Sequence, residues 1–430
     1  MIDLCLTNCK LVPENKECSI GIKDGKIVSI TKIPPESGKI IDIRGKPVLP
    51  GLIDSHVHFR DPGLIYKEDF RSGSEAAAAG GFTTVMDMPN TKPPTNTSKA
   101  FLEKLEIARK KSIVDFGLHA GVDNLEEIKK IAELKPASFK IFMDLVDNSF
   151  LMEVFEEISK LPQKYVISIH AEDENLTNYC TEMEKNGLYE NPKIYTKARP
   201  PVSEVVAVST AIAFSRFYGQ KIHICHVSTK KSLEILNMAK NDGNKVTSEI
   251  TPHHMFLDDS YFYKYANIVK TNPPLRDIDN KLDISYLKNI DIIGTDHAPH
   301  ALKEKEKNVW EAPPGIPNLE TTLPLLLNKV NENKIGFNDI KLLLCENPAK
   351  IFNIENKGKI AVGMDADFVV VDMKKEYIIN PNDFKTNAKY SPFEGFKVKG
   401  IPVMTIVRGN IVMHEGKVFE NRGKFVYVET

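Results

Sequence analysis

Short apolar, partly β-branched runs alternate with amphipathic stretches between residues 48 and 298. Each run has the length of one buried strand, and the stretches between many of them repeat with the 3.6-residue period of a helix. The segment from Phe101 to Ala108 shows this period, and Asn124-Leu-Glu-Glu127 has the form of a helix-capping sequence. The eight predicted strands are Val48–Phe59, Thr83–Met88, Ile113–Val122, Ser138–Asp144, Tyr165–Glu172, Lys221–Ser228, Lys245–Thr251 and Asp291–Asp296.

Eight strand–helix units in one run predict an α/β fold, a closed (β/α)8 TIM barrel. A doubly wound open sheet is the alternative, but no Gly-x-Gly-x-x-Gly sequence follows the first strand. We therefore expect residues 48–357 to form a (β/α)8 barrel.

The two ends of the chain have a different pattern. Residues 1–47 and the residues from about 358 onward contain short alternating runs, separated by turn sequences such as Asp-Gly and Glu-Gly-Lys. The runs near the C-terminus are Val369–Asp372, Met404–Val407, Ile411–Val412 and Lys424–Val428. We predict a small β-sandwich domain made of residues 1–47 plus 358–430, with the barrel, residues 48–357, inserted between its halves.

Composition narrows the classes of partner. With 430 residues, 27% of them charged, and a net charge of −1, the chain has room for both domains and shows no sign of a nucleic-acid partner. No apolar run approaches the roughly 20 residues that cross a bilayer, and no signal peptide is visible, so we expect no membrane association and a cytoplasmic location. The six scattered cysteines are expected to be reduced, mostly in the core.

Polar side chains recur where the predicted barrel strands end. His56 and His58 are two residues apart, so they point to the same face of a strand, and Arg60 follows them. An isolated His-x-His is more often a surface feature than a metal site, but four further strand ends carry Lys140, His170, His226 and Asp296. Barrel enzymes place their chemistry at these ends, and imidazole is a common zinc ligand. The pattern therefore predicts a metal centre.

These motifs resemble the dihydroorotases of the amidohydrolase superfamily, of the monofunctional bacterial and archaeal class I type, and the likeness covers nearly the whole chain. It rests on Pro50-Gly-Leu-Ile-Asp54, His58-Phe-Arg60-Asp61-Pro62-Gly63, Asp87-Met-Pro-Asn90-Thr91, His170-Ala-Glu172, His226-Val-Ser228, Asn272-Pro-Pro-Leu-Arg276, Asp296-His-Ala-Pro-His300 and the segment 358–367. The family usually has glutamate where Asp61 stands, which exchanges one carboxylate for another.

The resemblance implies two zinc ions. His56, His58 and Asp296 would bind one ion, and His170 with His226 the other. A carboxylated Lys140 would bridge them, with Asp144 as the alternative bridge and a solvent-facing Lys140 as the simpler interpretation of that residue. The implied substrate-binding residues are His58, Arg60, Asn90, Asn272, His300, Pro314 and Gly315.

The implied activity is the reversible cyclisation of N-carbamoyl-L-aspartate to L-dihydroorotate in de novo pyrimidine biosynthesis. In the ring-opening direction a hydroxide held between the metals attacks the ring, and Asp296 is the general acid and base. Arg60 would hold the substrate carboxylate through two parallel hydrogen bonds, unless it pairs with Asp61 instead. Two alternatives stay open: a hydantoinase- or allantoinase-type cyclic amidase, and a non-catalytic partner of aspartate transcarbamoylase. Homo-oligomerisation and association with that transcarbamoylase also stay open.

The remaining candidates concern the surroundings of the site. Three histidines, His119, His223 and His414, are expected to be structural. His253 and His254 are given no role, and His297 is expected to orient Asp296 or to pack in its loop. The segment Ala301–Pro313 is predicted to be a loop beside the site, with its charged first half in solvent and Trp310, the only tryptophan, in its second half. This loop is predicted either to become ordered when substrate binds or to be an ordinary solvated connection.

Overall fold

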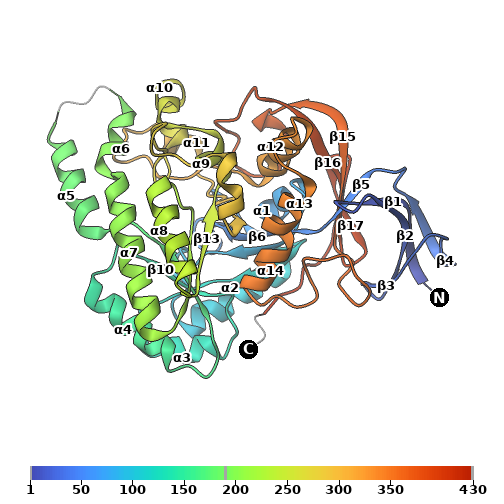
Figure 1. Cartoon of the computed structure of the whole chain (residues 1–430), viewed down its shortest axis with the longest axis horizontal. Helices are drawn as coiled ribbons and strands as arrows, with labels where there is room; N and C mark the ends of the chain where they lie inside the picture. The colour runs from blue at the N-terminus through green and yellow to red at the C-terminus, as the bar shows by residue number, and fades with distance from the viewer. Residues whose placement is uncertain (1, 188–190, 428–430) are drawn as a thin grey trace.

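Parallel strands surrounded by helices form a barrel at the centre of the molecule (Figure 1). The computed structural model describes residues 2–187 and 191–427. The barrel strands are β6 (Leu52–Val57), β7 (Phe82–Asp87), β8 (Asp115–Leu118), β9 (Ala120–Gly121), β10 (Phe139–Phe142), β11 (Val166–His170), β12 (Lys221–Ile224), β13 (Val246–Ile250) and β14 (Ile292–Ile293). Strands β8 and β9 lie on either side of His119, and the ring closes where the His58 N–H donates to the His297 carbonyl oxygen, at 2.9 Å. The predicted fold class is confirmed.

The first predicted strand, Val48–Phe59, is divided between two sheets, so that prediction was wrong in its extent. β5 (Pro47–Pro50) joins the sheet of the chain ends, and β6 begins the barrel. Gly51 stands between the two strands and leaves room for Thr83, because a Cβ there would lie 2.2 Å from Thr83 Oγ1. Both halves are buried, so the apolar pattern cannot reveal the break.

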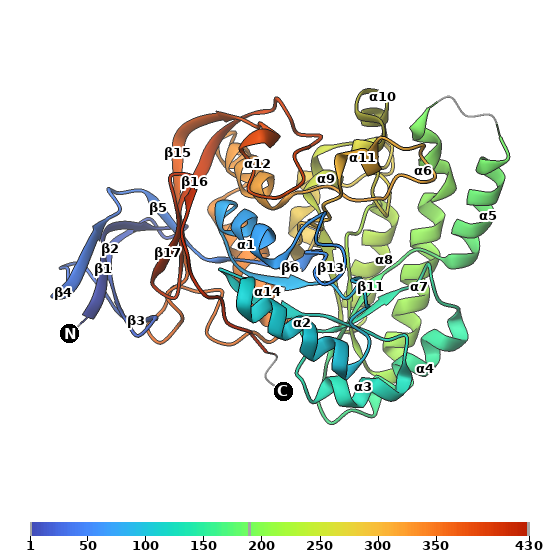
Figure 2. The same ribbon diagram turned by 180° about the vertical axis from the view of Figure 1, so that it is seen from behind.

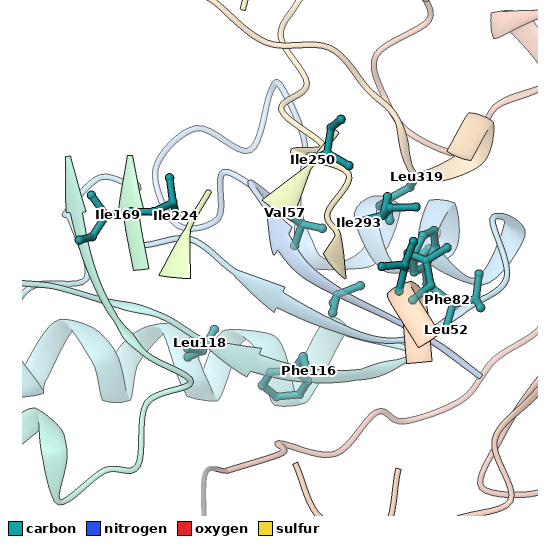
Figure 3. Packing of buried hydrophobic residues seen from close by; sticks show 14 of the residues in the cluster. Leu52, Val57, Phe82, Phe116, Leu118, Ile169, Ile224, Ile250, Ile293 and Leu319 are labelled. Carbon is teal, nitrogen blue, oxygen red and sulfur yellow. The ribbon is translucent and has the colours of Figure 1, made fainter. Parts of the chain in front are cut away.

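Apolar side chains of the barrel strands pack against apolar side chains of the helices around them. Figure 3 shows part of this cluster, in which Leu52 and Phe82 are fully buried. Ile169 of β11 and Ile224 of β12 are register partners on neighbouring parallel strands. Each side chain buried in this way contributes about 1.5–3 kcal/mol.

The helices cover the outside of the barrel (Figure 2). The longer ones are α1 (Phe70–Ala79), α2 (Ser98–Lys111), α3 (Leu125–Ala132), α4 (Asn148–Ser159), α5 (Glu174–Lys185), α7 (Pro201–Tyr218), α8 (Lys230–Asn241) and α12 (Leu319–Asn331). The short ones are α6 (Tyr195–Ala198), α9 (Pro252–Phe256), α10 (Phe262–Tyr265), α11 (Leu302–Lys305), α13 (Phe337–Lys341) and α14 (Asn347–Ile351). In the part of the chain that the structure describes, none of them is both long and apolar enough to span a membrane.

The predicted cap of α3 is half formed. Asn124 accepts the Glu126 N–H at 3.2 Å, as an N-cap does. The Glu127 carboxylate does not close a capping box with Asn124, because it accepts the Ser98 N–H, at 2.7 Å, in the first turn of α2. The charge of Glu127 thus ties two neighbouring helices together.

Strands from both ends of the chain form one sheet beside the barrel (Figure 1). They are β1 (Ile2–Leu11), β2 (Lys16–Lys23), β3 (Lys26–Thr31), β4 (Ser37–Asp42), β5, β15 (Phe368–Ile378), β16 (Lys397–Val407), β17 (Asn410–His414) and β18 (Lys417–Val418). Strand β5 joins the two halves, since it pairs with β1 in parallel and with β15 antiparallel. The domain bounds 1–47 plus 358–430 and 48–357 stay a prediction.

The predicted strand Lys424–Val428 is wrong as far as the described residues reach; Val428 lies outside them. Only Phe425 forms a β-bridge there, and its partner is Phe116 of the barrel strand β8. The Phe425 ring packs against Phe116 and Phe101, with ring centroids 5.9 and 6.4 Å apart. This ring packing and backbone hydrogen bonds, such as that from the Val426 N–H to the Phe116 carbonyl oxygen at 2.8 Å, hold the C-terminal segment against the barrel.

The cysteines follow the expectation of reduced core residues. All six are free thiols; five are buried and Cys180 is partly exposed.

A buried lysine links the barrel to the segment that leads into β15. The ammonium group of Lys357 lies 2.7 Å from Asp115 of β8 and 3.2 Å from Asp365, and it also contacts Asp367. Arg408 pairs with Asp115 from the other side. Although burial opposes the charge, the three carboxylates raise the pKa of Lys357 above its ordinary range.

We expect Lys357→Met to destabilise the protein by about 3–5 kcal/mol, because it leaves buried carboxylates without their shared cation. The measurement is the urea dependence of unfolding. Lys359→Met, which removes an exposed lysine two residues away, is the control and should change stability by less than about 0.5 kcal/mol. Equal stability of the two variants would contradict a structural role for the Lys357 cluster.

Candidate active site

Every residue predicted to bind metal or substrate lines one cavity of about 440 Å³. The cavity lies at the carboxyl ends of the barrel strands, which is where barrel enzymes carry their active sites. Its lining includes His56, His58, Arg60, Asn90, Lys140, Asp144, His170, His226, Asn272, Asp296, His300, Pro314 and Gly315. Residues that are far apart in the sequence therefore converge as the motifs indicated.

Three acceptor atoms meet in one half of the cavity. Asp296 Oδ1 lies 3.4 Å from His56 Nε2 and 3.1 Å from His58 Nε2. The other nitrogen of each ring is already engaged: His56 Nδ1 with Glu249 Oε1 at 2.7 Å, and His58 Nδ1 with Asn90 Oδ1 at 2.6 Å. Since those partners are acceptors, Nδ1 carries the proton in both rings and Nε2 presents its lone pair to Asp296.

Two nitrogen lone pairs aimed at a carboxylate oxygen repel that oxygen, and a cation between them would replace the repulsion with attraction. Burial lowers the pKa of His58 to about 4, although Asp296 opposes this shift, so its ring is neutral near pH 7. Two imidazole nitrogens and one carboxylate oxygen are a usual zinc ligand set. His56, His58 and Asp296 therefore fit a divalent metal ion.

A second pair of nitrogens faces the same cavity. His170 Nδ1 and His226 Nε2 are 3.1 Å apart. His170 Nε2 lies 2.9 Å from Glu172 Oε2, so its proton is donated to Glu172 and its Nδ1 is left as a lone pair. This pair has the orientation that a second metal ion needs.

Lys140 is buried beside these histidines and does not extend to solvent. Only 1% of it is exposed, and its Nζ lies 3.0 Å from Cys225 Sγ. Asp144, the alternative bridge, is engaged elsewhere, because its Oδ2 accepts from Arg199 Nη2 at 2.6 Å. The position of Lys140 is thus compatible with a bridging group, whereas Asp144 is held by a neighbouring cation.

Sequence reasoning missed Glu249, which supports both ligand groups. Its carboxylate contacts the His56 ring and also accepts the backbone N–H of His226, at 3.1 Å. A Cβ on Gly294, directly after β14, would lie 2.2 Å from Glu249 Oε2, so a larger residue there would displace this carboxylate. A glutamate within the predicted strand Lys245–Thr251 was the available signal.

Arg60 and His300 form a second corner of the cavity. Arg60 Nη2 lies 3.1 Å from His300 Nε2, and Arg60 Nε donates to the Pro299 carbonyl oxygen at 3.3 Å. Asp61, the alternative partner considered for Arg60, pairs instead with Lys111, whose Nζ lies 2.7 Å from Asp61 Oδ2. Arg60 is therefore directed into the cavity, where its guanidinium can bind an anion.

Three residues of the cavity have left-handed backbone conformations that non-glycine residues rarely adopt. The φ angles are 62° for Arg60, 37° for His226 and 45° for Asp296. Such conformations cluster at functional sites, where the surrounding structure holds them in place. Here they turn side chains at the strand ends towards one point.

Comparison with known proteins agrees with this geometry. The profile of the amidohydrolase family matches residues 48–412. The chain belongs to the amidohydrolase family. It is 46% identical to a dihydroorotase of Methanothermobacter thermautotrophicus, over 100% of this chain and 98% of that protein. It is also 46% identical to a dihydroorotase of Methanosphaera stadtmanae, over 99% of this chain and 100% of that protein. The solved L-hydantoinase (dihydropyrimidinase) of Arthrobacter aurescens superposes with a TM-score of 0.95 at 34% identity, over 99% of this chain and 100% of that one.

The other histidines of this amidohydrolase lie outside the cavity lining. His119 Nε2 contacts the Ser55 carbonyl oxygen at 2.9 Å, and His223 Nδ1 contacts Thr247 Oγ1 at 2.9 Å. His414 is exposed on β17. His254 Nε2 contacts the Pro273 carbonyl oxygen at 3.1 Å, and His253 Nδ1 lies 2.9 Å from Asn318 Nδ2. His297 accepts the Asn318 N–H at 3.2 Å, which packs it in its loop near the start of α12.

The segment Ala301–Pro313 begins with the short helix α11, and the prediction that its charged first half faces solvent fails at Lys305. Lys303 and Lys307 are exposed, but only 2% of Lys305 is exposed. Its ammonium group donates to the carbonyl oxygens of Lys270, Pro313 and Gly315, at 3.3, 3.0 and 3.0 Å. The wall of the cavity at Pro314–Gly315 is thereby held by a buried lysine, whose pKa is lowered well below its ordinary value by burial and by the nearby Lys270, Arg60 and Lys67.

We expect Glu249→Gln to weaken zinc binding about 10- to 100-fold, because the residue that orients His56 loses its charge. Titration of the metal-free protein against a chromophoric zinc chelator measures the affinity. Glu234→Gln, at an exposed position on α8, is the control. Unchanged affinity in Glu249→Gln would show that this carboxylate does not support the ligands.

We expect orotate or dihydroorotate to change the fluorescence of Trp310 saturably. The Trp310 ring packs against Tyr195, with centroids 6.3 Å apart, and the Tyr195 hydroxyl donates to Asn272 Oδ1 in the cavity wall at 2.6 Å. A ligand that contacts Asn272 therefore acts on the indole through one intervening ring. An unchanged spectrum at saturating ligand would leave this loop as a passive connection.

Proposed function

We propose that this protein is a dihydroorotase, which interconverts N-carbamoyl-L-aspartate and L-dihydroorotate in pyrimidine biosynthesis. The observation that carries the proposal is the presence, in one cavity, of two metal-ligand groups and the Arg60–His300 corner. The metal groups suit cleavage of a cyclic amide, and the corner suits a carboxylate that takes no part in the reaction. The curated relatives at 46% identity point to the same activity.

We propose that two zinc ions bind, one through His56, His58 and Asp296 and the other through His170 and His226, with carboxylated Lys140 between them. When bound, the ions would polarise the substrate carbonyl and lower the pKa of a water molecule towards 7. The convergence of lone pairs at these residues supports this assignment. Metal analysis of the active protein tests it, with two equivalents expected; activity without bound metal would overturn it.

The chain's own residues then move the proton and hold the ring. In ring opening, water adds to the amide carbon of dihydroorotate, and the bond from that carbon to the ring nitrogen breaks. Asp296 takes a proton from the water and returns one to the leaving nitrogen. In ring closure the same carboxylate removes the ureido proton.

Arg60 and His300 bind the carboxylate of the substrate in this proposal. A planar guanidinium gives two parallel hydrogen bonds to a carboxylate. Asn90 and Asn272 lie around the ring, and Pro314 with Gly315 lines one side of it. His58 contributes both to the metal site and to the wall of the substrate site.

Comparison of three substrates tests the proposal against the hydantoinase alternative, which the structural similarity to L-hydantoinase favours. Hydrolysis of dihydroorotate, hydantoin and allantoin is measured at equal concentrations of zinc-loaded enzyme. We expect the highest kcat/KM for dihydroorotate. A higher value for hydantoin or allantoin would support a different cyclic amidase, and zinc binding without any hydrolysis would support a non-catalytic partner protein.

A cytoplasmic location fits the free thiols, because a reducing compartment keeps cysteines unpaired. Homo-oligomerisation and association with aspartate transcarbamoylase stay predictions. Light scattering of the protein alone and in a mixture with the transcarbamoylase tests both.

We expect Asp296→Asn to lower kcat by about 100-fold or more, because the amide cannot shuttle the proton. Steady-state kinetics measure the loss. The control is the metal content and the circular dichroism of the same sample, which should show a folded protein with at least one zinc ion. Activity within a few-fold of the parent would remove Asp296 from this role.

We expect Arg60→Met to raise KM for both dihydroorotate and N-carbamoyl-aspartate about 10-fold or more, because a charge-assisted bidentate contact is lost. The KM values in the two reaction directions are the measurement. If KM is unchanged while the melting temperature falls, Arg60 is structural and the substrate assignment loses its main support.

A further inference from the structure

A buried lysine lies behind the Arg60–His300 corner and is not part of the metal centre or of the cavity lining. Lys67 stands in the turn between β6 and α1, and only 8% of it is exposed. Its Nζ lies 3.0 Å from His300 Nδ1 and 3.1 Å from Glu304 Oε1. Burying an ammonium group is unfavourable, so these two contacts call for an explanation.

The contacts of His300 fix which of its nitrogens carries the proton. Nε2 lies 2.9 Å from the Pro314 carbonyl oxygen, which only accepts, so Nε2 is the donor. Nδ1 faces Lys67 Nζ, which only donates, so Nδ1 is the acceptor. Lys67 therefore selects the neutral tautomer with its N–H at Nε2.

This tautomer directs a donor towards Arg60. Arg60 Nη2 and His300 Nε2 are 3.1 Å apart, and both carry hydrogen, so no hydrogen bond joins them. The single Nε2 hydrogen is donated to the Pro314 carbonyl oxygen, so a carboxylate oxygen bound at this corner would accept from Arg60 Nη2 and share the Nε2 hydrogen with Pro314. If the proton were on Nδ1 instead, His300 would present a lone pair to that oxygen and would repel it.

Lys67 also adds charge to this corner. Burial lowers the pKa of His300 most, and the neighbouring basic residues Arg60, Lys67 and Lys305 lower it further. The ring is therefore kept neutral. Glu304 neutralises part of the charge of Lys67, but its side chain is 23% exposed, so it is more screened by solvent than the buried lysine. The corner thus keeps a positive field directed at the cavity.

We infer that Lys67 is a positioning and specificity-determining residue: by fixing the His300 tautomer and adding a buried positive charge, it makes the cavity favour cyclic amides that carry a carboxylate. This inference rests on the proposed function, because it assigns the Arg60–His300 corner to the substrate carboxylate. It goes beyond that function by separating substrates with a carboxylate from the uncharged rings on which hydantoinases act.

A series of variants at Lys67 separates the two contributions. Lys67→Arg keeps both the donor and the charge, Lys67→Gln keeps a donor without charge, and Lys67→Met has neither. Lys303→Met, at an exposed position on the neighbouring helix α11, is the matched control for loss of one positive charge. The zinc-loaded full-length enzymes are compared for kcat and KM with dihydroorotate and N-carbamoyl-aspartate.

We expect KM to rise about 10-fold or more in Lys67→Met, less in Lys67→Gln, and about 3-fold or less in Lys67→Arg and Lys303→Met, with kcat nearly constant throughout. A structural role alone would lower the active fraction, and hence kcat, and would leave KM unchanged. An unchanged KM in both Lys67→Met and Lys67→Gln would overturn the inference, and so would an equal rise in Lys303→Met.

The ring-nitrogen NMR shifts of His300 give a readout that does not depend on activity. The signals are assigned by their loss in His300→Gln. We expect the Nε2–H tautomer in the parent, Lys67→Arg and Lys67→Gln, and a mixture of tautomers in Lys67→Met. A parent enzyme that fails to hydrolyse dihydroorotate would overturn the proposed function, whereas an unchanged tautomer in Lys67→Met would overturn the inference about Lys67 itself.

Discussion

The site depends on acceptor atoms that are buried together at the ends of barrel strands. His56, His58 and Asp296 meet at one point, and His170 and His226 face each other beside it. Lone pairs that face one another in a medium of low dielectric constant are repulsive, so a cation bound among them would stabilise the arrangement. The closed barrel makes the convergence possible, because its parallel strands deliver side chains from distant parts of the sequence to one face.

Neighbouring carboxylates and amides orient these ligands. Glu249 engages His56, Asn90 engages His58 and Glu172 engages His170, so each ring keeps one nitrogen for the cavity. Such partners set the tautomer and the direction of a metal-binding imidazole. Gly294 provides the space for Glu249, which ties the metal centre to the packing of β13 against the next strand.

Beside the metal centre, one corner of the cavity is formed by basic residues. Arg60 lines it directly, and Lys67 and Lys305 lie behind that wall, buried in a protein whose net charge is −1. Lys305 donates only to backbone carbonyl oxygens, whereas Lys67 acts on a histidine of the wall. A metal centre suits any cyclic amide, so the discrimination between substrates is expected from this corner and not from the ligands.

The sequence by itself determined the barrel and indicated the candidate metal ligands and Arg60, because each leaves a local signal: an apolar run that ends in a histidine, a lysine or an aspartate, or an arginine two residues after His58. Tertiary structure alone decided the break at Gly51, the burial of Lys305 and the partners of the ligands. His56 and Glu249 are 193 residues apart, and Lys67 and His300 are 233 apart. No periodicity or motif spans such distances. These contacts form only when the barrel closes and brings each buried polar group next to its partner.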